Sequence, residues 1–129
     1  MWKISKEFHF SASHQLSDLP DDHQCARLHG HNYVLKITLG SSQLDNVGFI
    51  VDYGELGFVK DVVDRMDHRH LNNLFTFNPT SEKICRYLWN EFDAALHVSK
   101  FHQSVSYLSV SLSETPKTWA EYESTRCVG

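Results

Sequence analysis

The sequence lacks the features that mark several classes of protein. It has only three cysteines, Cys25, Cys85 and Cys127, an odd and widely spaced set with no CxxC pair, so a disulfide framework is not expected. No apolar run approaches the roughly 18 residues that a membrane-spanning helix needs. The first six residues also lack the apolar run of a signal peptide. These absences predict a protein of the reducing cytoplasm that does not enter a membrane.

Positive charge is scarce as well. The 12 lysines and arginines are outnumbered by 16 aspartates and glutamates, and the formal net charge is −4. A nucleic-acid-binding surface usually requires a basic field, so nucleic acid is not expected as the main partner. The chain shows no repeat, linker or low-complexity tract and is predicted to form one domain, residues 1–129. What is abundant is histidine, the commonest metal-ligating side chain, with nine copies.

Alternation of apolar and polar residues predicts four β-strands. They are expected over residues 2–10, 29–39, 105–114 and 118–122. The clearest is the second, in which Tyr33, Leu35 and Ile37 fall on one face. Residues 11–28 are rich in Ser, Asp and Pro and are expected to form a long loop, which in a compact domain is often functional.

Helical spacing of apolar residues predicts two helices between the second and third strands. Asp52, with Glu55 three residues later, resembles the capping box of a first helix that is expected to end near Asp67. The dipeptide Asn78-Pro79 is expected to begin the second helix, since proline is tolerated in a first turn. The order β-β-α-α-β-β predicts an α+β fold in which two helices cover one face of an antiparallel four-stranded sheet. Such a sheet has two open edges, which pairing with neighbouring copies would cover.

Three histidines form the first candidate site. His29 and His31 are two residues apart on a predicted strand, so their side chains point to the same face. His14 follows the first strand in the same alternation, and it reaches the pair if the two strands are neighbours. A His-Gly-His triplet alone also occurs by chance, and the position of His14 is what favours a metal site. Three imidazoles with an open fourth position are typical of catalytic zinc.

Cys25 is the second candidate, in the loop that leads into the histidine strand. A cysteine beside a metal has a lowered pKa, which makes the thiolate available near neutral pH. The residue could act as a fourth zinc ligand, a base or a nucleophile, or it could be an inert buried thiol. The polar residues before it, Asp21 to Gln24, argue against full burial.

Two further carboxylates have less distinctive surroundings. Asp67 precedes His68 and can orient its imidazole, although spacing alone favours charged residues that simply decorate a helix C-terminus. Glu114 ends a predicted strand in the alternation of its apolar face. A carboxylate that points inward is costly unless paired. Glu114 is therefore either a group that grips the N–H donors of a ligand or a strand-end residue that reaches solvent.

Seven segments together carry a family resemblance. They are residues 10–14 (FSASH), 25–31 (CARLHGH), 48–53 (GFIVDY), 66–68 (MDH), 71–72 (LN), 78–82 (NPTSE) and 114–115 (ET). In this order they resemble the 6-pyruvoyl-tetrahydropterin synthase superfamily. Three residues separate Cys25 from His29, which is more similar to the 6-carboxy-tetrahydropterin branch than to the pyruvoyl branch, where five residues lie between.

The resemblance implies a fold, an assembly and a role for each residue. The fold would be the T-fold (tunnelling fold), in which two trimers stack into a homohexamer with active sites at subunit interfaces. Zn²⁺ would be held by His14, His29 and His31. Cys25 would be the catalytic base, assisted by Asp67 and His68. Glu114 would bind the pterin, with Thr80 and Ser81 contacting it from a neighbouring subunit.

The implied reaction is that of a lyase. It converts 7,8-dihydroneopterin triphosphate to 6-carboxy-5,6,7,8-tetrahydropterin, acetaldehyde and triphosphate, an early step toward queuosine and other 7-deazaguanines. The alternatives are the pyruvoyl-type reaction, which eliminates triphosphate and leaves the side chain intact, and a zinc- or pterin-binding protein without catalysis.

Overall fold

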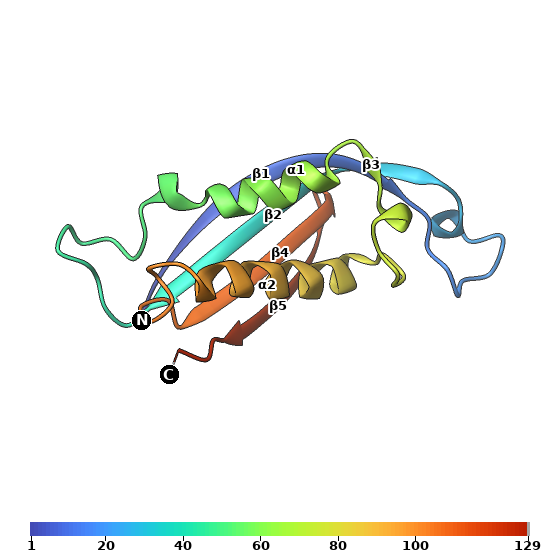
Figure 1. The fold of residues 1–129 in the computed structure, drawn as a ribbon. Coiled ribbons are helices and arrows are strands. Elements are labelled where there is room, and N and C mark those ends of the chain that lie inside the picture. The colour runs from blue at the N-terminus through green and yellow to red at the C-terminus, as the bar shows by residue number, and fades with distance from the viewer. Residues whose placement is uncertain (129) are drawn as a thin grey trace.

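The structure, a computed structural model, describes residues 1–128 (Figure 1). Its strands are β1 (Trp2–His14), β2 (His29–Ser41), β3 (Arg69–His70), β4 (Tyr107–Thr115) and β5 (Thr118–Thr125). Its two α-helices are α1 (Gly57–Met66) and α2 (Ser81–His97). The sheet order is β3-β1-β2-β4-β5, and every neighbouring pair is antiparallel except β3 with β1.

Both helices lie over the same face of the sheet (Figure 1). The alternating apolar residues of β2 and β4, such as Leu35, Ile37 and Val110, are fully buried on that face. They pack against the apolar side of α2, where Leu88 and Phe92 are also buried. The predicted α+β fold with two helices on one face is thereby confirmed. None of the helices in residues 1–128 is long and apolar enough to cross a bilayer.

The predicted strand count of four is one too low. The additional strand, β3, has two residues and pairs in parallel with Ala12 and Ser13 of β1. Two residues cannot show an alternating pattern, so no sequence signal marks them. In contrast, β1 is longer than predicted and continues through His14, because it pairs with β2 residue for residue from Trp2 to His14.

Both helices begin later than predicted. Asp52 caps a 3₁₀ turn over Tyr53–Glu55 and accepts a hydrogen bond from Gly54 N, while α1 starts only at Gly57. The second helix starts at Ser81 and not at Asn78-Pro79, because the Thr80 hydroxyl accepts from Lys83 N as a helix N-cap.

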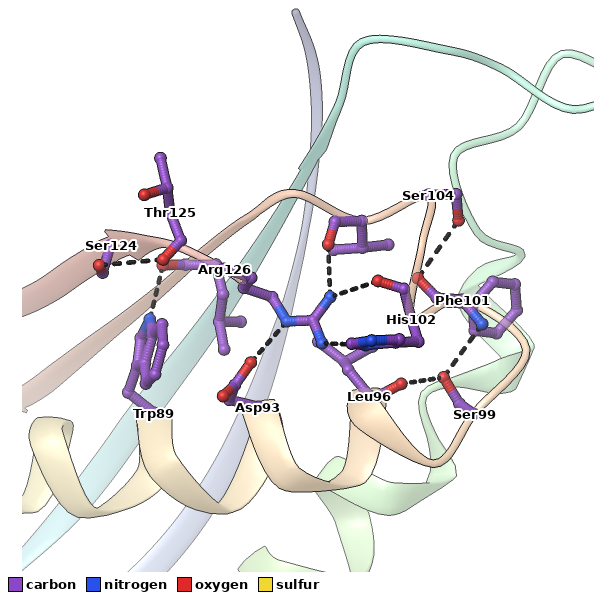
Figure 2. A network of polar contacts seen from close by, with 12 residues as sticks. Trp89, Asp93, Leu96, Ser99, Phe101, His102, Ser104, Ser124, Thr125 and Arg126 are labelled. Carbon is purple, nitrogen blue, oxygen red and sulfur yellow. Dashed lines mark hydrogen bonds and ion pairs between the residues drawn. The ribbon is translucent and has the colours of Figure 1, made fainter. Parts of the chain in front are cut away.

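A buried arginine directly after β5 bonds to α2, at the end of the sheet where β4 begins (Figure 2). The side chain of Arg126 is 0% exposed, and its Nε lies 2.6 Å from Asp93 Oδ1. The guanidinium also donates to the backbone oxygens of His102 and Val105 and contacts His102 Nδ1 at 3.3 Å. All of its partners are protein groups, so its burial is compensated.

Candidate functional site

Three histidine side chains converge where β1 ends and β2 begins. His14 is the direct partner of His29 in the antiparallel register, and His31 follows two residues later on the same face. One ligating atom from each residue lies within 4.8 Å of those from the other two. The ring centroids are 4.5 to 5.1 Å apart. The pairing of these strands thus creates a site that can hold one metal ion.

The outer nitrogens of this cluster are already bonded. His14 Nδ1 lies 2.9 Å from the carbonyl oxygen of Pro79, and His29 Nδ1 lies 2.7 Å from that of Arg27. A carbonyl can only accept, so both Nδ1 atoms carry the proton and both Nε2 atoms keep a free lone pair. Metal-ligating histidines are typically held in this way, with the second ring nitrogen donating to a carbonyl or carboxylate.

The inner nitrogens lack partners. Within residues 1–128, His14 Nε2 and His31 Nε2 are buried and form no hydrogen bond. Glu114 Oε2 lies 3.2 Å from His31 Nε2, but the pair lacks hydrogen-bond geometry. Since a buried polar atom without a partner costs about 1–3 kcal/mol, these atoms fit a bound metal ion better than they fit a closed core.

Burial also favours the protonation state that binds metal. It lowers the pKa of His14 and of His31, although Glu114 opposes the effect at both. The neutral imidazole is the form that coordinates a metal. Three features of the cluster thus suit a cation. The strand register brings the imidazoles together, the carbonyl bonds leave the Nε2 lone pairs free, and burial favours the neutral form.

Cys25 lies beside the histidine cluster. It sits in a 3₁₀ turn over Gln24–Ala26, half-buried, and its amide donates to His23 Nδ1 at 3.0 Å. With Gln24, it lines a cavity of about 310 Å³ whose other walls are His29, Gly30 and His31. Its sulfur is not in the group of atoms that lie within 4.8 Å of one another. Cys25 therefore lies beside the histidine cluster without joining its converging ligand atoms.

Glu114 connects the cluster to the start of α2. Its Oε1 accepts a hydrogen bond from the Ser81 hydroxyl, and its Oε2 faces His31. Glu114 and Ser81 also line a cavity of about 380 Å³ at the β5 edge, together with Trp119. Thr80 does not line this cavity, and its hydroxyl is used to cap α2. Ser81 thus contacts Glu114 within one chain, and the predicted contact of Thr80 and Ser81 with a pterin across a subunit boundary stays a prediction.

Asp67 and His68 form a pair beside β1. Asp67 Oδ2 lies 3.0 Å from His68 Nδ1, and Asp67 Oδ1 accepts from Ser11 N at 2.9 Å. The Ser11 amide, followed by His68, lowers the pKa of Asp67. His68 has φ +58° in the left-handed region, and its amide donates to Ser11 O. Both residues thus bind the backbone of β1 in addition to standing at the end of α1, and their role in catalysis stays a prediction.

His68 contributes to a cavity that opens largely on the face of the sheet away from the helices. This cavity has a volume of about 450 Å³, and its walls include Ser11, Ser13 and Asn32 and also His31 of the histidine cluster. The first three alternate with Ala12, His14 and His31, so they point away from the helices. Glu114 and Ser81 meet on the helix-covered face, and Asp67 binds the backbone of Ser11 at the end of α1. His31 lines the cavity that holds His68 as well as the one that holds Cys25.

Two side chains at the site were absent from the sequence prediction. The hydroxyl of Tyr33 lies 3.3 Å from His14 Nδ1 and so contacts the histidine cluster. It shares the alternation of His29 and His31, which is the signal that marks it. Trp119 lines the Glu114 cavity through a β-bulge that no local pattern indicates.

Comparison with known proteins gives one consistent result. Residues 3–125 match the family model of 6-pyruvoyl tetrahydropterin synthase. The chain is 34% identical over 133 residues to a 6-carboxy-5,6,7,8-tetrahydropterin synthase of Synechocystis (98% of this chain, 96% of that protein). It is 30% identical over 150 residues to the protein of the same name from Haemophilus influenzae (95% and 99%). The 6-pyruvoyl tetrahydropterin synthase of Caenorhabditis elegans is similar in structure, with a TM-score of 0.76, 27% identity and 95% of each chain covered.

Proposed function

The chain belongs to the 6-pyruvoyl tetrahydropterin synthase family, and from this we propose that it is a zinc-dependent 6-carboxy-tetrahydropterin synthase. It would act in the cytoplasm as a lyase that converts 7,8-dihydroneopterin triphosphate to 6-carboxy-5,6,7,8-tetrahydropterin, acetaldehyde and triphosphate, toward queuosine and related 7-deazaguanines. The observation that carries the proposal is the set of three converging histidines whose buried Nε2 atoms lack partners, with Cys25 on the same cavity. The names of the relatives from Synechocystis and Haemophilus support the carboxy-type product.

His14, His29 and His31 would hold one Zn²⁺ ion. Three imidazoles leave a coordination position open for substrate. The bound ion supplies Lewis acidity for the oxygens of the pterin side chain. Cys25 is not needed to complete the ligand set, since the three histidines converge without it.

Cys25 would accept the proton that the reaction removes from the pterin side chain. It is half-buried on the wall it shares with His29 and His31, within reach of a molecule held there. A positioned base contributes about 10²–10⁴-fold to a rate. We therefore expect Cys25→Ala to retain the metal and to lose turnover by that factor. Loss of the metal in this variant would make Cys25 a ligand.

Glu114 would hold the pterin ring. A carboxylate has about four lone-pair sites, and Glu114 uses one for the Ser81 hydroxyl. The remaining capacity suits the adjacent N–H donors on the edge of a pterin. Ser81 orients this carboxylate, and Thr80 would approach the ring only across a subunit boundary.

A second copy of the chain would complete the site. His68, next to Asp67, shares its cavity with Ser11, Ser13 and Asn32, whose side chains point away from the helices, and we propose that it serves a substrate bound to a neighbouring copy. The outer strands support such an assembly, because β5 has an open edge and β3 covers only Ala12 and Ser13 of β1. We propose a homohexamer built from two trimers, as the T-fold implies.

Subunit complementation tests the shared site. Cys25→Ala and His68→Ala should each reduce activity strongly in a homo-oligomer, and co-expressing them would create interfaces at which both wild-type residues meet. Activity should return in the mixed oligomer. If Cys25 and His68 acted from the same chain, every site would carry a defect and the mixture would remain inactive.

Product analysis tests the proposed reaction. Zinc-loaded protein is incubated with 7,8-dihydroneopterin triphosphate, acetaldehyde is assayed, and the pterin is identified by mass, with Cys25→Ala as the control. Acetaldehyde with 6-carboxy-tetrahydropterin is the expected outcome. Triphosphate with 6-pyruvoyl-tetrahydropterin and no acetaldehyde would place the chain with the pyruvoyl type, as in the Caenorhabditis elegans protein. Absence of turnover with zinc bound would leave a binding protein.

A further inference from the structure

A β-bulge places one tryptophan opposite Glu114. Leu112 pairs with Ala120 and Thr115 pairs with Thr118, so two residues of β4, Ser113 and Glu114, face the single residue Trp119 of β5. Bulges re-aim side chains and are over-represented next to active sites. Here the bulge brings a carboxylate and an indole to the wall of the same cavity.

Trp119 is not packed into the structure in the way that Trp89 is. Trp89 is 9% exposed, donates from Nε1 to Leu108 O, and packs edge-to-face on Tyr122. Trp119 is 50% exposed. The ammonium of Lys36 lies over the indole, 5.6 Å from its ring centroid. Lys36 therefore lies toward one face of the indole, and the half of Trp119 that stays exposed leaves apolar surface for a ligand.

The cavity has the chemistry of a site for a flat heteroaromatic ring. Its volume of about 380 Å³ is within the range of small-molecule pockets. Glu114 supplies an acceptor for ring N–H groups, and the indole supplies a π surface. Aromatic side chains commonly bind the faces of nucleobases, which resemble the pterin in size, flatness and hydrogen-bonding edge.

We propose that Trp119 is a binding residue on which the pterin ring stacks while Glu114 holds the edge of the ring. The inference rests on the proposed function, because it assumes a pterin in the Glu114 cavity. The two residues recognise different features of the ligand. The carboxylate selects the hydrogen-bonding edge, and the indole favours a planar, fused ring over a smaller or puckered one.

Calorimetric titration of the full-length zinc-loaded protein with 7,8-dihydroneopterin, which has the ring but no triphosphate leaving group, tests the proposal. Trp119→Leu removes the π surface and keeps an apolar side chain. We expect its Kd to rise about tenfold, within the range known for a base on an aromatic side chain. Trp119→Phe should retain most of the affinity. Zinc content and thermal stability of both variants should equal those of the wild type.

Trp2 provides the matched control. It is 53% exposed, close to the value for Trp119, but it does not line the Glu114 cavity. Trp2→Phe should leave Kd unchanged and retain quenching of the protein fluorescence by the pterin, whereas Trp119→Phe should lose most of that quenching. A Trp119→Leu variant that binds as tightly as the wild type would refute the role of Trp119 and leave the proposed function intact. Failure of the wild type and of Trp119→Leu alike to bind the pterin would refute both.

Discussion

Two polar clusters lie near opposite ends of β2 and differ in how their buried atoms are satisfied. At one end, His14, His29 and His31 converge with two buried Nε2 atoms that have no partner in residues 1–128. At the other end, where Ser106 N donates to Gly40 O, the guanidinium of Arg126 is paired with a carboxylate and two carbonyls. The first arrangement leaves two buried nitrogens without partners among the described residues, and the second gives its buried guanidinium a carboxylate and two carbonyl oxygens.

The difference separates a binding site from a structural one. Both clusters contain histidine and a carboxylate, so composition does not distinguish them. The buried side chain of Arg126, which follows β5, bonds to Asp93 of α2 and to Val105 just before β4 (Figure 2). It thereby joins these three parts of the structure. In the histidine cluster, two buried Nε2 atoms have no partner among the described residues, which lowers the free energy of unfolding. A cation bound to these atoms would raise that free energy.

Removal of a histidine should have the largest effect, and only at the first cluster. His31→Ala is expected to reduce bound zinc from about one ion per chain to nearly none, because two imidazoles leave too few ligands. Activity should vanish with the metal, while the fold persists. Metal analysis by mass spectrometry checks this, with the exposed His9→Ala as control. Stoichiometric zinc in His31→Ala would remove that residue from the ligand set.

Removal of the arginine should affect stability and leave the metal in place. Arg126→Met leaves Asp93 and the carbonyls of His102 and Val105 without their donor. Asp93 is partly exposed and can be solvated, so at about 1–3 kcal/mol for each of the two carbonyls left unpaired we expect a loss of about 2–6 kcal/mol in urea unfolding. The control, Arg65→Met, removes an exposed arginine 4.0 Å from Glu91 and should cost less than about 1 kcal/mol. Equal stabilities for the two variants would show that the Arg126 cluster is not structural.

Acid should destabilise the metal-free protein through the histidine cluster. Burial lowers the pKa of His14 and His31 from 6.5, so below that pH the unfolded chain binds protons that the folded chain does not. The free energy of unfolding therefore falls as the pH drops through about 6.5 toward the folded-state values. Melting temperatures of metal-free protein at about pH 7.5 and about pH 5.5 measure the effect, which His31→Asn should reduce. Identical pH dependence in this variant would exclude His31 as a source.

The smallest effect is expected from Tyr33. Its hydroxyl lies 3.3 Å from His14 Nδ1, which already has Pro79 O as its main acceptor at 2.9 Å. Tyr33→Phe should therefore weaken zinc binding by about tenfold or less, at the lower end of the effects seen when a group that orients a metal ligand is removed. Competition with a zinc chelator measures this shift. A loss as large as that of His31→Ala would mean that Tyr33, and not the backbone carbonyl, orients His14.

The histidine cluster was predictable from the sequence, and the arginine cluster was not. The alternation of His29, His31 and Tyr33 is local, and pairing of two neighbouring strands is enough to add His14. Arg126 lies 33 residues from Asp93 along the chain and follows a segment without pattern, so its burial depends on the packed tertiary structure.

The same limit applies to the remaining differences. The bulge that aims Trp119 is a register irregularity between two strands and has no one-strand signal. The alternation of β1 extends to His14, but the predicted strand ends early because Ser and His resemble loop residues. The position of Asp67 and His68 beside β1 follows from their bonds to the backbone of Ser11, which are contacts between distant segments.

X-ray absorption spectroscopy at the zinc edge of the purified protein tests most directly whether the unpaired nitrogens are metal ligands. If they are, the ion is surrounded by three imidazole nitrogens at about 2.0–2.1 Å and no sulfur, with an open position for solvent or substrate. A sulfur scatterer at about 2.3 Å would instead make Cys25 a fourth ligand of a closed structural site, and its role as a base would be wrong.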